Sequence, residues 1–258
     1  MGRAELTRRR VLSAGGLATA GGLAGCTDIL GGSDSGGPDE TGTVSEGVLS
    51  SLPLDVLLTF DDGIEDVSGN DRPVSVEGGE LVEGRSGQAL RLRPPDEYFT
   101  VQSGLESPGF DSGDEAEPFS YAAWVQIHSA RRQELFTNEG SRRRLAINSD
   151  RQVCGRMWGG RSDIEGSPAC GAQVPLEEWV HVGFVFTGTE GRVYYNGDEI
   201  ARNPWRGYTG SAKTCSGSRA AGGGDCEAAP GEVDATIDEW AIIRTDVSQS
   251  TMRELASA

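Results

Sequence analysis

Aromatic side chains with polar neighbours stand in two glycine-containing stretches of the sequence, where sugar-binding proteins usually place them. An indole or phenol ring stacks against the apolar face of a pyranose, while nearby amide and guanidinium groups hydrogen-bond its hydroxyls. The sequence equally allows that these rings only cover one end of a folded domain. The residues of this candidate ligand site are Trp158, Arg161, Asn203, Trp205, Arg206 and Tyr208.

Residues 1–25 have the layout of an export signal. Consecutive arginines from Arg8 precede a weakly hydrophobic, glycine-rich stretch, a pattern that resembles a twin-arginine signal peptide. The apolar stretch, from Val11 to Gly25, is shorter than the roughly 18 to 20 residues that cross a bilayer. Leu23-Ala24-Gly25-Cys26 resembles a lipoprotein processing box. We therefore expect a lipid anchor at Cys26 on the outer face of the cytoplasmic membrane; a plain secretory signal with an incidental Cys26 is the alternative.

Residues 26–51 are expected to be a flexible tether, and residues 52–258 to form one folded domain. The tether is rich in Gly, Ser, Asp, Glu and Thr and has no aromatic residue. Such a segment buries too little apolar surface to offset the conformational entropy lost on ordering. Its predicted role is to hold the domain away from the membrane.

The chain is strongly acidic, with 40 Asp and Glu against 23 Lys and Arg and a net charge of -17. This charge repels nucleic acid, so we expect no nucleic-acid partner. It also destabilises the compact state by self-repulsion unless salt screens it, and at molar salt the Debye length falls to about 3 Å. We therefore expect a protein suited to high salt; an ordinary acidic secreted protein is the alternative.

Four cysteines of the predicted domain favour disulfides, because an even number in an exported chain is typical of a disulfide framework. A zinc site usually needs close C-x-x-C pairs, which the spacing does not provide. Three connectivities are open, and we favour the pairing local in sequence, Cys154 with Cys170 and Cys215 with Cys226. On the chain-entropy model, each bridge would stabilise the fold by about 3 kcal/mol. Residues 213–231 lack strand-forming runs and predict a long surface loop.

Short runs of β-branched and aromatic residues from Leu54 onward predict an all-β, antiparallel fold. Alternation in residues 119–127 and 180–186 predicts two core-facing stripes. Asn196-Gly197 predicts a two-residue type I′ hairpin, since both of its central residues need positive φ. The one helix expected is a short C-terminal one with Ser248 as N-cap.

Five segments, in order, resemble the laminin-G-like jelly-roll domains that are relatives of concanavalin-A-like lectins and glucanases. The resemblance spans residues 54–257 and implies a sandwich of two antiparallel sheets, often one calcium ion, and frequent roles in binding glycans or proteins. Residues 156–172 and 204–232 depart from the family pattern as apparent insertions. The segments are LLTFDDGIEDVSGNDRPVSV, GRSGQALRLR with YFTV, FSYAAWVQI, EEWVHVGFVFTGTEGRVYYNGDEIA and IDEWAIIRTDVSQSTMRELAS.

Calcium is expected where the family brings the first acidic loop close to the last strand. Ca²⁺ takes six to eight oxygen ligands. The resemblance therefore implies a structural calcium ion with Asp62, Asp66 and Asp238 as its chief ligands. The alternative is that these carboxylates belong to the general acidic coat.

Catalysis is not expected. The related glucanases present their carboxyl groups in an E-x-D-x-x-E pattern, which this sequence lacks. Asp238 and Glu239 are adjacent and predicted to point to opposite faces of a strand. His181 fits a hydrogen-bonded core histidine, and His128 has no recognisable nucleophile partner. The predicted function is a membrane-anchored, non-catalytic module that recognises carbohydrate; the alternatives are a protein-adhesion or structural surface module and a glycoside hydrolase whose site is unrecognised.

Overall fold

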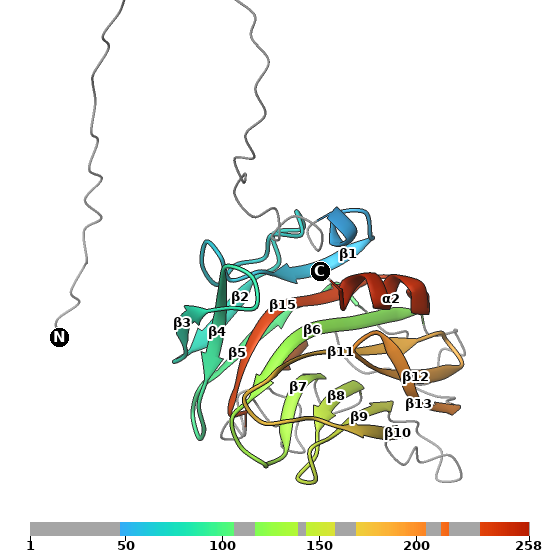
Figure 1. Cartoon of the computed structure of the whole chain (residues 1–258). Coiled ribbons are helices and arrows are strands. Elements are labelled where there is room, and N and C mark those ends of the chain that lie inside the picture. The colour runs from blue at the N-terminus through green and yellow to red at the C-terminus, as the bar shows by residue number, and fades with distance from the viewer. Residues whose placement is uncertain are drawn as a thin grey trace, which may run out of the picture. The chain divides into compact units, whose positions relative to one another are not determined.

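The chain forms two antiparallel β-sheets packed face to face (Figure 1), which confirms the predicted sandwich. The computed structural model describes residues 47–105, 117–138, 143–157, 169–204, 213–216 and 233–257. Within these residues, one sheet has eight strands and the other has seven. None of the described helices is long and apolar enough to cross a membrane.

The eight-stranded sheet runs in the order β13-β12-β11-β6-β15-β4-β3, and β1 pairs with β15 beyond the end of β4. Its strands are β1 (Leu54–Leu58), β3 (Glu80–Glu83), β4 (Gln88–Leu92), β6 (Phe119–Ile127), β11 (Trp179–Phe186), β12 (Glu190–Tyr195), β13 (Asp198–Pro204) and β15 (Ala235–Ile243).

The seven-stranded sheet runs in the order β10-β9-β8-β7-β14-β5-β2. Its strands are β2 (Val74–Glu77), β5 (Tyr98–Gln102), β7 (Gln133–Asn138), β8 (Arg143–Ile147), β9 (Gln152–Met157), β10 (Ala169–Gln173) and β14 (Lys213–Ser216).

The core between the sheets contains both predicted stripes and a stack of aromatic rings. The ring of Phe136, from the seven-stranded sheet, lies between two rings of the eight-stranded sheet. Its centroid is 4.6 Å from that of Tyr121 and 4.3 Å from that of Trp240. Trp240 is fully buried, and its indole N–H donates to the carbonyl of Leu135 at 3.0 Å. The stack therefore ties the two sheets together by packing and by one hydrogen bond. The buried stripes are Phe119, Tyr121, Ala123, Val125 and Ile127, and Val180, Val182, Phe184 and Phe186.

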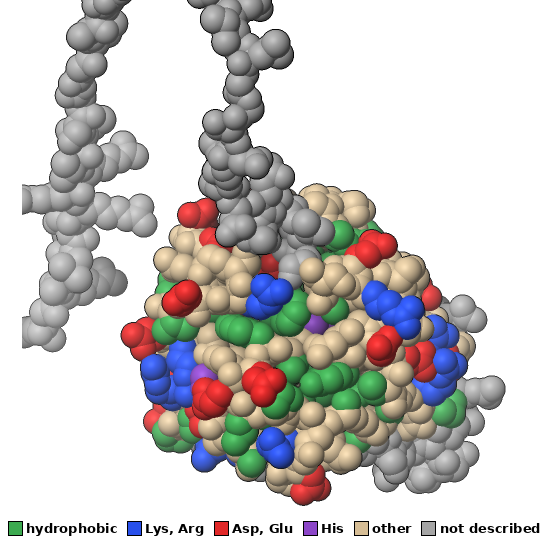
Figure 2. Space-filling model, in the orientation of Figure 1, with side chains coloured by type: hydrophobic (Ala, Val, Ile, Leu, Met, Phe, Trp, Pro, Cys, Tyr) green, Lys and Arg blue, Asp and Glu red, His purple; other side chains and the backbone are tan. Residues whose placement is uncertain are grey.

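The C-terminal helix α2 (Gln249–Leu255) packs on the outer face of the eight-stranded sheet (Figure 1). Ser248 caps it as predicted, accepting a hydrogen bond from the backbone N–H of Thr251 at 3.1 Å. Met252 is fully buried over Gly183, where a Cβ would lie 2.7 Å from the Met252 sulfur. The surface of the molecule seen in Figure 2 mixes acidic and basic side chains without one dominant sign.

The predicted hairpin turn is also confirmed. Asn196 and Gly197 have φ values of 46° and 80°, the left-handed conformation that a type I′ turn requires. They join β12 to β13 in antiparallel register.

One expectation needs correction, and the structure adds detail to two others. Residues 213–231 do not form only a surface loop, because β14 at their start pairs with both β5 and β7 inside the seven-stranded sheet. The apparent insertion at residues 156–172 begins and ends inside β9 and β10. A helical turn at residues 47–49 lies within the expected tether, and its Leu49 is buried in the cluster under α2. In each case tertiary pairing or packing, which short sequences do not encode, organises the segment.

Candidate functional site

Two strand ends that precede the predicted ligand residues meet at one corner of the sandwich. Met157 ends β9, and Pro204 ends β13 one residue after Asn203. Asn203 pairs with Gly191 of β12. A Cβ at Gly191 would lie 3.8 Å from the Met157 side chain, so β9 and β12 approach closely here. Trp158 and Trp205 follow these two ends directly in the sequence.

Glycines bring the two sheets together at this corner. The ring of Phe184 packs over Gly155 of the seven-stranded sheet and Gly191 of the eight-stranded sheet. A Cβ at these positions would lie 2.4 Å and 2.7 Å from ring carbons of Phe184. The absence of side chains therefore allows the close approach that places the ends of β9 and β13 together.

Of the six predicted ligand residues, only Asn203 belongs to the described part of the chain, where it is half-buried. The other predicted ligand residues lie outside the described residues: Trp158, Arg161, Trp205, Arg206 and Tyr208. The structure places the strand ends beside them close together, and the grouping and contacts of these five residues stay a prediction.

A buried arginine holds the same corner and was missed from the sequence. Arg143 at the start of β8 is 1% exposed and pairs with Met157 in register. Its guanidinium carbon lies 5.3 Å from the ring centre of Phe119, and it donates to the carbonyl of Leu105 at 3.3 Å. A cation held against an aromatic face in this way braces three strand ends. The only signal in the sequence was the run of arginines at 142–144.

Ion pairs line the rim of the corner on β12 and β13. The Glu190 carboxylate accepts from Arg192 Nε at 2.7 Å, and Glu199 accepts from Arg202 Nε at 2.6 Å. The hydrogen bond that Arg192 donates to the Glu190 carboxylate raises the pKa of Arg192. Glu190 is paired in register with Pro204, next to the candidate ligand residues. The rim is therefore polar and offers hydrogen-bonding groups beside the corner.

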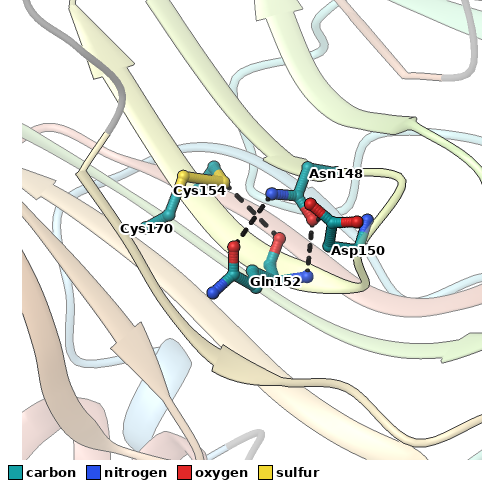
Figure 3. Close-up of a disulfide and its surroundings, with 5 residues drawn as sticks. All are labelled: Asn148, Asp150, Gln152, Cys154 and Cys170. Carbon is teal, nitrogen blue, oxygen red and sulfur yellow. Dashed lines mark hydrogen bonds between the residues drawn. A yellow bond between two sulfur atoms is a disulfide. The ribbon is translucent and has the colours of Figure 1, made fainter.

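The predicted disulfide between Cys154 and Cys170 is confirmed (Figure 3). The two residues are register partners on β9 and β10, with Cα atoms 4.2 Å apart. The bridge closes the stretch that contains Trp158 and Arg161. Beside it, Asn148 Oδ1 accepts from the backbone N–H of Gln152 at 2.8 Å and fixes the turn between β8 and β9. The second predicted bridge stays untested, because the Cys215 side chain and Cys226 lie outside the described residues.

Asp66, one of the expected calcium ligands, accepts hydrogen bonds from its own loop. Its carboxylate accepts from the backbone N–H groups of Leu57, Ser68 and Arg72 at 2.9 to 3.0 Å. This pattern closes the first acidic loop onto β1. Asp62 is exposed in the same loop.

Asp238 is likewise occupied by backbone donors. Its Oδ2 accepts from the N–H groups of Arg85 and Ser86 at 2.9 and 3.1 Å, and Oδ1 accepts from that of Glu239 at 2.8 Å. Burial raises the pKa of Asp238 to about 7, and the nearby Glu239 charge adds to the effect. Asp238 therefore fastens the β3–β4 loop to β15.

These contacts do not fit calcium binding by the expected set. In the part of the chain that the structure describes, no three His, Cys, Asp or Glu residues are grouped to hold a metal ion. Asp62, Asp66 and Asp238 are thus not grouped as one set of ligands within the described residues, and a cation at Asp66 or Asp238 would compete with their N–H donors. Calcium binding by the chain stays a prediction.

The two histidines and Asp238 are buried or hydrogen-bonded within the fold. His181 is 2% exposed, and burial lowers its pKa to about 3. Its Nδ1 has no hydrogen-bond partner among the described residues, so the expected hydrogen-bonded core histidine is buried but is not bonded through this atom within that part of the chain. Both ring nitrogens of His128 are occupied, by Glu177 at 2.7 Å and Thr236 at 2.9 Å. Asp238 is buried and engaged with backbone, as described above.

The fold and this corner define a two-sheet lectin-like sandwich with its candidate site at one end. Residues 99–251 match the family model of the concanavalin A-like lectin/glucanases superfamily, and the chain belongs to this superfamily. No curated protein matches the chain in sequence.

Solved structures similar to this chain include several binding domains. The binding domain of Paraclostridial mosquitocidal protein 1 superposes with a TM-score of 0.61 and 17% identity, over 81% of this chain and 52% of that one. The ligand-binding domain of botulinum neurotoxin serotype D, in complex with N-acetylneuraminic acid, superposes with a TM-score of 0.58 and 13% identity, over 83% of this chain and 52% of that one. The chain thus spans about half the length of these toxin domains.

A third similar structure is matched over nearly its whole length. Domain 4 of AbnA, a GH43 extracellular arabinanase from Geobacillus stearothermophilus, is in complex with arabinotriose. It superposes with a TM-score of 0.58 and 16% identity, over 80% of this chain and 98% of that one. At such identities these likenesses establish a shared fold.

Proposed function

We propose that this protein is a non-catalytic carbohydrate-binding module held at the outer face of the cytoplasmic membrane. The observation that carries the proposal is the match over 98% of the arabinotriose-bound domain 4 of AbnA, a module of the same fold and extent. The serotype D toxin domain, in complex with N-acetylneuraminic acid, is a second carbohydrate complex on this fold.

The corner of the sandwich supports a binding site there. The ends of β9 and β13 meet at Gly191, so the residues that follow them start from neighbouring points. Each end is followed at once by a tryptophan, the side chain best suited to stack on a sugar ring. The disulfide ties β9 to β10, the two strands that flank the stretch with Trp158, and a cross-link of this kind lowers the entropy lost when a ligand orders such a stretch.

Removing the tryptophans tests the proposal. Trp158→Ala and Trp205→Ala should each weaken binding to glycans retained by the wild-type protein at least tenfold on a glycan array and by calorimetry. Trp179→Ala is the matched control, because Trp179 is a half-buried tryptophan that pairs with Gln126 near the opposite end of β6 and β11. This control should bind as the wild type does.

Wild-type protein that binds no glycan on a broad array would contradict the proposal and favour a protein-adhesion module. Release of reducing sugar from a polysaccharide panel would contradict the non-catalytic part and favour a glycoside hydrolase.

We also propose that Cys26 carries the membrane anchor. The support is the Leu23-Ala24-Gly25-Cys26 box after a basic, small-residue leader. Cys26→Ser should release the protein into the medium, whereas the matched change Ser33→Ala in the same tether should leave it in the membrane fraction. Membrane association of the Cys26→Ser variant would refute the anchor.

A further inference from the structure

A cavity of about 950 Å³ opens beside β1 and the loop that follows this strand. Four of the side chains that line it, those of Asp61, Asp62, Val67 and Asn70, are exposed, so a ligand reaches them directly from solvent. The volume is within the range of small-molecule sites in proteins. We call this cavity the loop pocket; its principal lining residues are Leu52, Leu57, Asp61, Asp62, Val67 and Asn70.

A turn anchored in the core places two carboxylates in the loop pocket. Phe60 has a φ of 66°, which bulky residues rarely adopt, and its buried ring packs edge-on against that of Phe99, with centroids 6.1 Å apart. Asp61 and Asp62 follow directly in the chain. Asp61 Oδ1 also accepts from the backbone N–H of Gln88 at 2.8 Å. The position of this acidic turn is therefore fixed on both sides by the folded domain.

No cation of the described residues balances these two carboxylates. Neither Asp61 nor Asp62 forms an ion pair with the described part of the chain, and no Lys or Arg is among the described residues that line the pocket. Arg72 follows in the same loop, but Asp55 holds it at 2.7 Å and holds Arg244 at 2.9 Å. The loop pocket therefore offers negative charge to a ligand from solvent.

An apolar wall completes the loop pocket. Val67 is 47% exposed, the largest exposure of any large hydrophobic side chain among the described residues. Its backbone N–H donates to the carbonyl of Leu57 at 2.8 Å, which holds Val67 against β1. Leu52 and Leu57 extend the wall. A ligand with a hydrocarbon surface would gain free energy by covering this wall, because apolar area would leave water.

The amide of Asn70 supplies a hydrogen-bond acceptor. Its Nδ2 donates to the carbonyls of Leu54 and Asp55 at 2.9 and 3.2 Å, which fixes the orientation of the amide. Its Oδ1 accepts no hydrogen bond from the described residues. A hydroxyl group of a ligand can therefore donate to this oxygen.

These features select a ligand that combines a positive charge, an apolar face and hydroxyl groups. An amino sugar has all three, since its ammonium group can pair with the carboxylates of Asp61 and Asp62 while one face of its ring covers Val67. A neutral sugar would leave both carboxylates unpaired, and an acidic sugar would be repelled. We propose that the loop pocket is a binding site for an amino sugar residue with a free amine. This inference rests on the proposed glycan-binding function.

The test compares two forms of one probe on the full mature chain. A glucosamine trisaccharide and its N-acetylated form are titrated by calorimetry with a chelator present, at about pH 5.5, where an amine is protonated. The acetylated form keeps the rings and linkages and lacks the charge. We expect the wild-type protein to bind the amine form more tightly by about tenfold or more. Equal affinity for the two forms would overturn the proposal.

A second probe separates recognition of the sugar from general attraction of cations to an acidic chain. Trilysine carries comparable positive charge without a sugar ring. It should bind more weakly than the glucosamine trisaccharide by about tenfold, because it lacks the ring that covers the apolar wall. Equal affinity for trilysine would overturn the amino-sugar site and leave only charge attraction.

Charge variants locate the site. Asp61→Asn and Asp62→Asn should each lower the affinity for the glucosamine trisaccharide by about fivefold or more. Asparagine at position 61 keeps an oxygen for the N–H of Gln88, and Asp62 is exposed, so both variants should fold. Asp150→Asn is the matched control, since it removes the same charge from an exposed position in the turn between β8 and β9. This control should bind as the wild type does.

A variant of the apolar wall tests the pocket without a change of charge. Val67→Ser should lower the affinity for the glucosamine trisaccharide, because the ring then covers less apolar surface. Val76→Ser is its control, since Val76 is a 38% exposed valine on β2 that does not line the pocket.

The outcomes separate the two proposals. Affinity for the glucosamine trisaccharide that is unchanged in Asp62→Asn or in Val67→Ser would overturn the loop-pocket site. A wild-type protein that binds only neutral glycans would overturn this site and leave the proposed function intact. A wild-type protein that binds no carbohydrate overturns both.

Discussion

Burial moves the pKa values of Asp238 and His181, which lie on either side of Trp124, in opposite directions. Asp238, Trp124 and His181 are register partners across β15, β6 and β11, on the outer face of the eight-stranded sheet. Burial disfavours the charged form of each acid or base, so the pKa of Asp238 rises to about 7 and that of His181 falls to about 3. Both side chains are thus held in their neutral forms between these values.

The pH dependence of stability follows from these shifts. A raised acid pKa stabilises the fold below the ordinary value of 3.8, and this contribution is lost as pH rises towards 7. A lowered histidine pKa stabilises the fold above 6.5, and this contribution is lost as pH falls towards 3. Between pH 4 and 6.5 the two contributions therefore oppose each other.

Single substitutions should expose each contribution. In His181→Phe the unfolding free energy should fall as pH rises from 4.5 to 6.5; in Asp238→Asn it should fall as pH drops over the same window. Each slope should approach about 1.4 kcal/mol per pH unit relative to the wild type. Urea unfolding at several pH values measures both, with the exposed Asp246→Asn as control. Parallel pH profiles for all four proteins would contradict the assignment.

At the scale of elements, the long strands and tight turns were predictable because their signals are local. Alternation of apolar and polar residues in 119–127 and 180–186 predicts strands with one buried face, as observed. Asn196-Gly197 predicts a type I′ turn because Asn and Gly tolerate the positive φ values that this turn requires. β14 was missed because four residues, Lys213–Ser216, carry no alternation, and the strand is specified by the neighbours β5 and β7. The role of Asp238 was missed because its partners, Arg85 and Ser86, are about 150 residues away in the sequence.

The candidate site was predictable only in part. Residue types suggested sugar stacking at Trp158 and Trp205, and the structure adds that the strand ends before these residues approach each other at Gly191. The position of Arg144 between Thr137 and Arg156 could not be read from the sequence, since it depends on the register of three strands.

The strand β10 depends on its disulfide. Most of its residues are half-buried, and it lies at the end of the seven-stranded sheet, where it pairs with β9 alone within that sheet. Cys154→Ser with Cys170→Ser should lower the unfolding free energy by about 3 kcal/mol on the chain-entropy account. Denaturant unfolding measures the loss, and hydrogen exchange should localise it to β9 and β10. A reductant should reproduce the loss in the wild type and have no effect on the double variant at this site.

At the scale of the whole molecule, we expect net charge to affect stability. The chain has a net charge of -17, and folding brings its negative charges close together, where they repel one another. Salt screens this repulsion. The melting temperature should therefore rise when potassium chloride is raised from about 0.05 M to about 2 M. Calorimetric scans measure the melting temperature. A sucrose solution of the same osmolality is the control, because sucrose is excluded from the protein surface but does not screen charges. A melting temperature that stays flat or falls with salt would contradict adaptation to high salt.

Strand β15 sits between β6 on one side and β1 and β4 on the other, although it follows all of them along the chain. On the ribosome, the edges of these three strands stay unpaired until residues 235–243 have been synthesised. Sheet edges of this kind recruit other chains. The nascent polypeptide therefore carries these unpaired edges, and the tendency to aggregate that goes with them, for most of its translation.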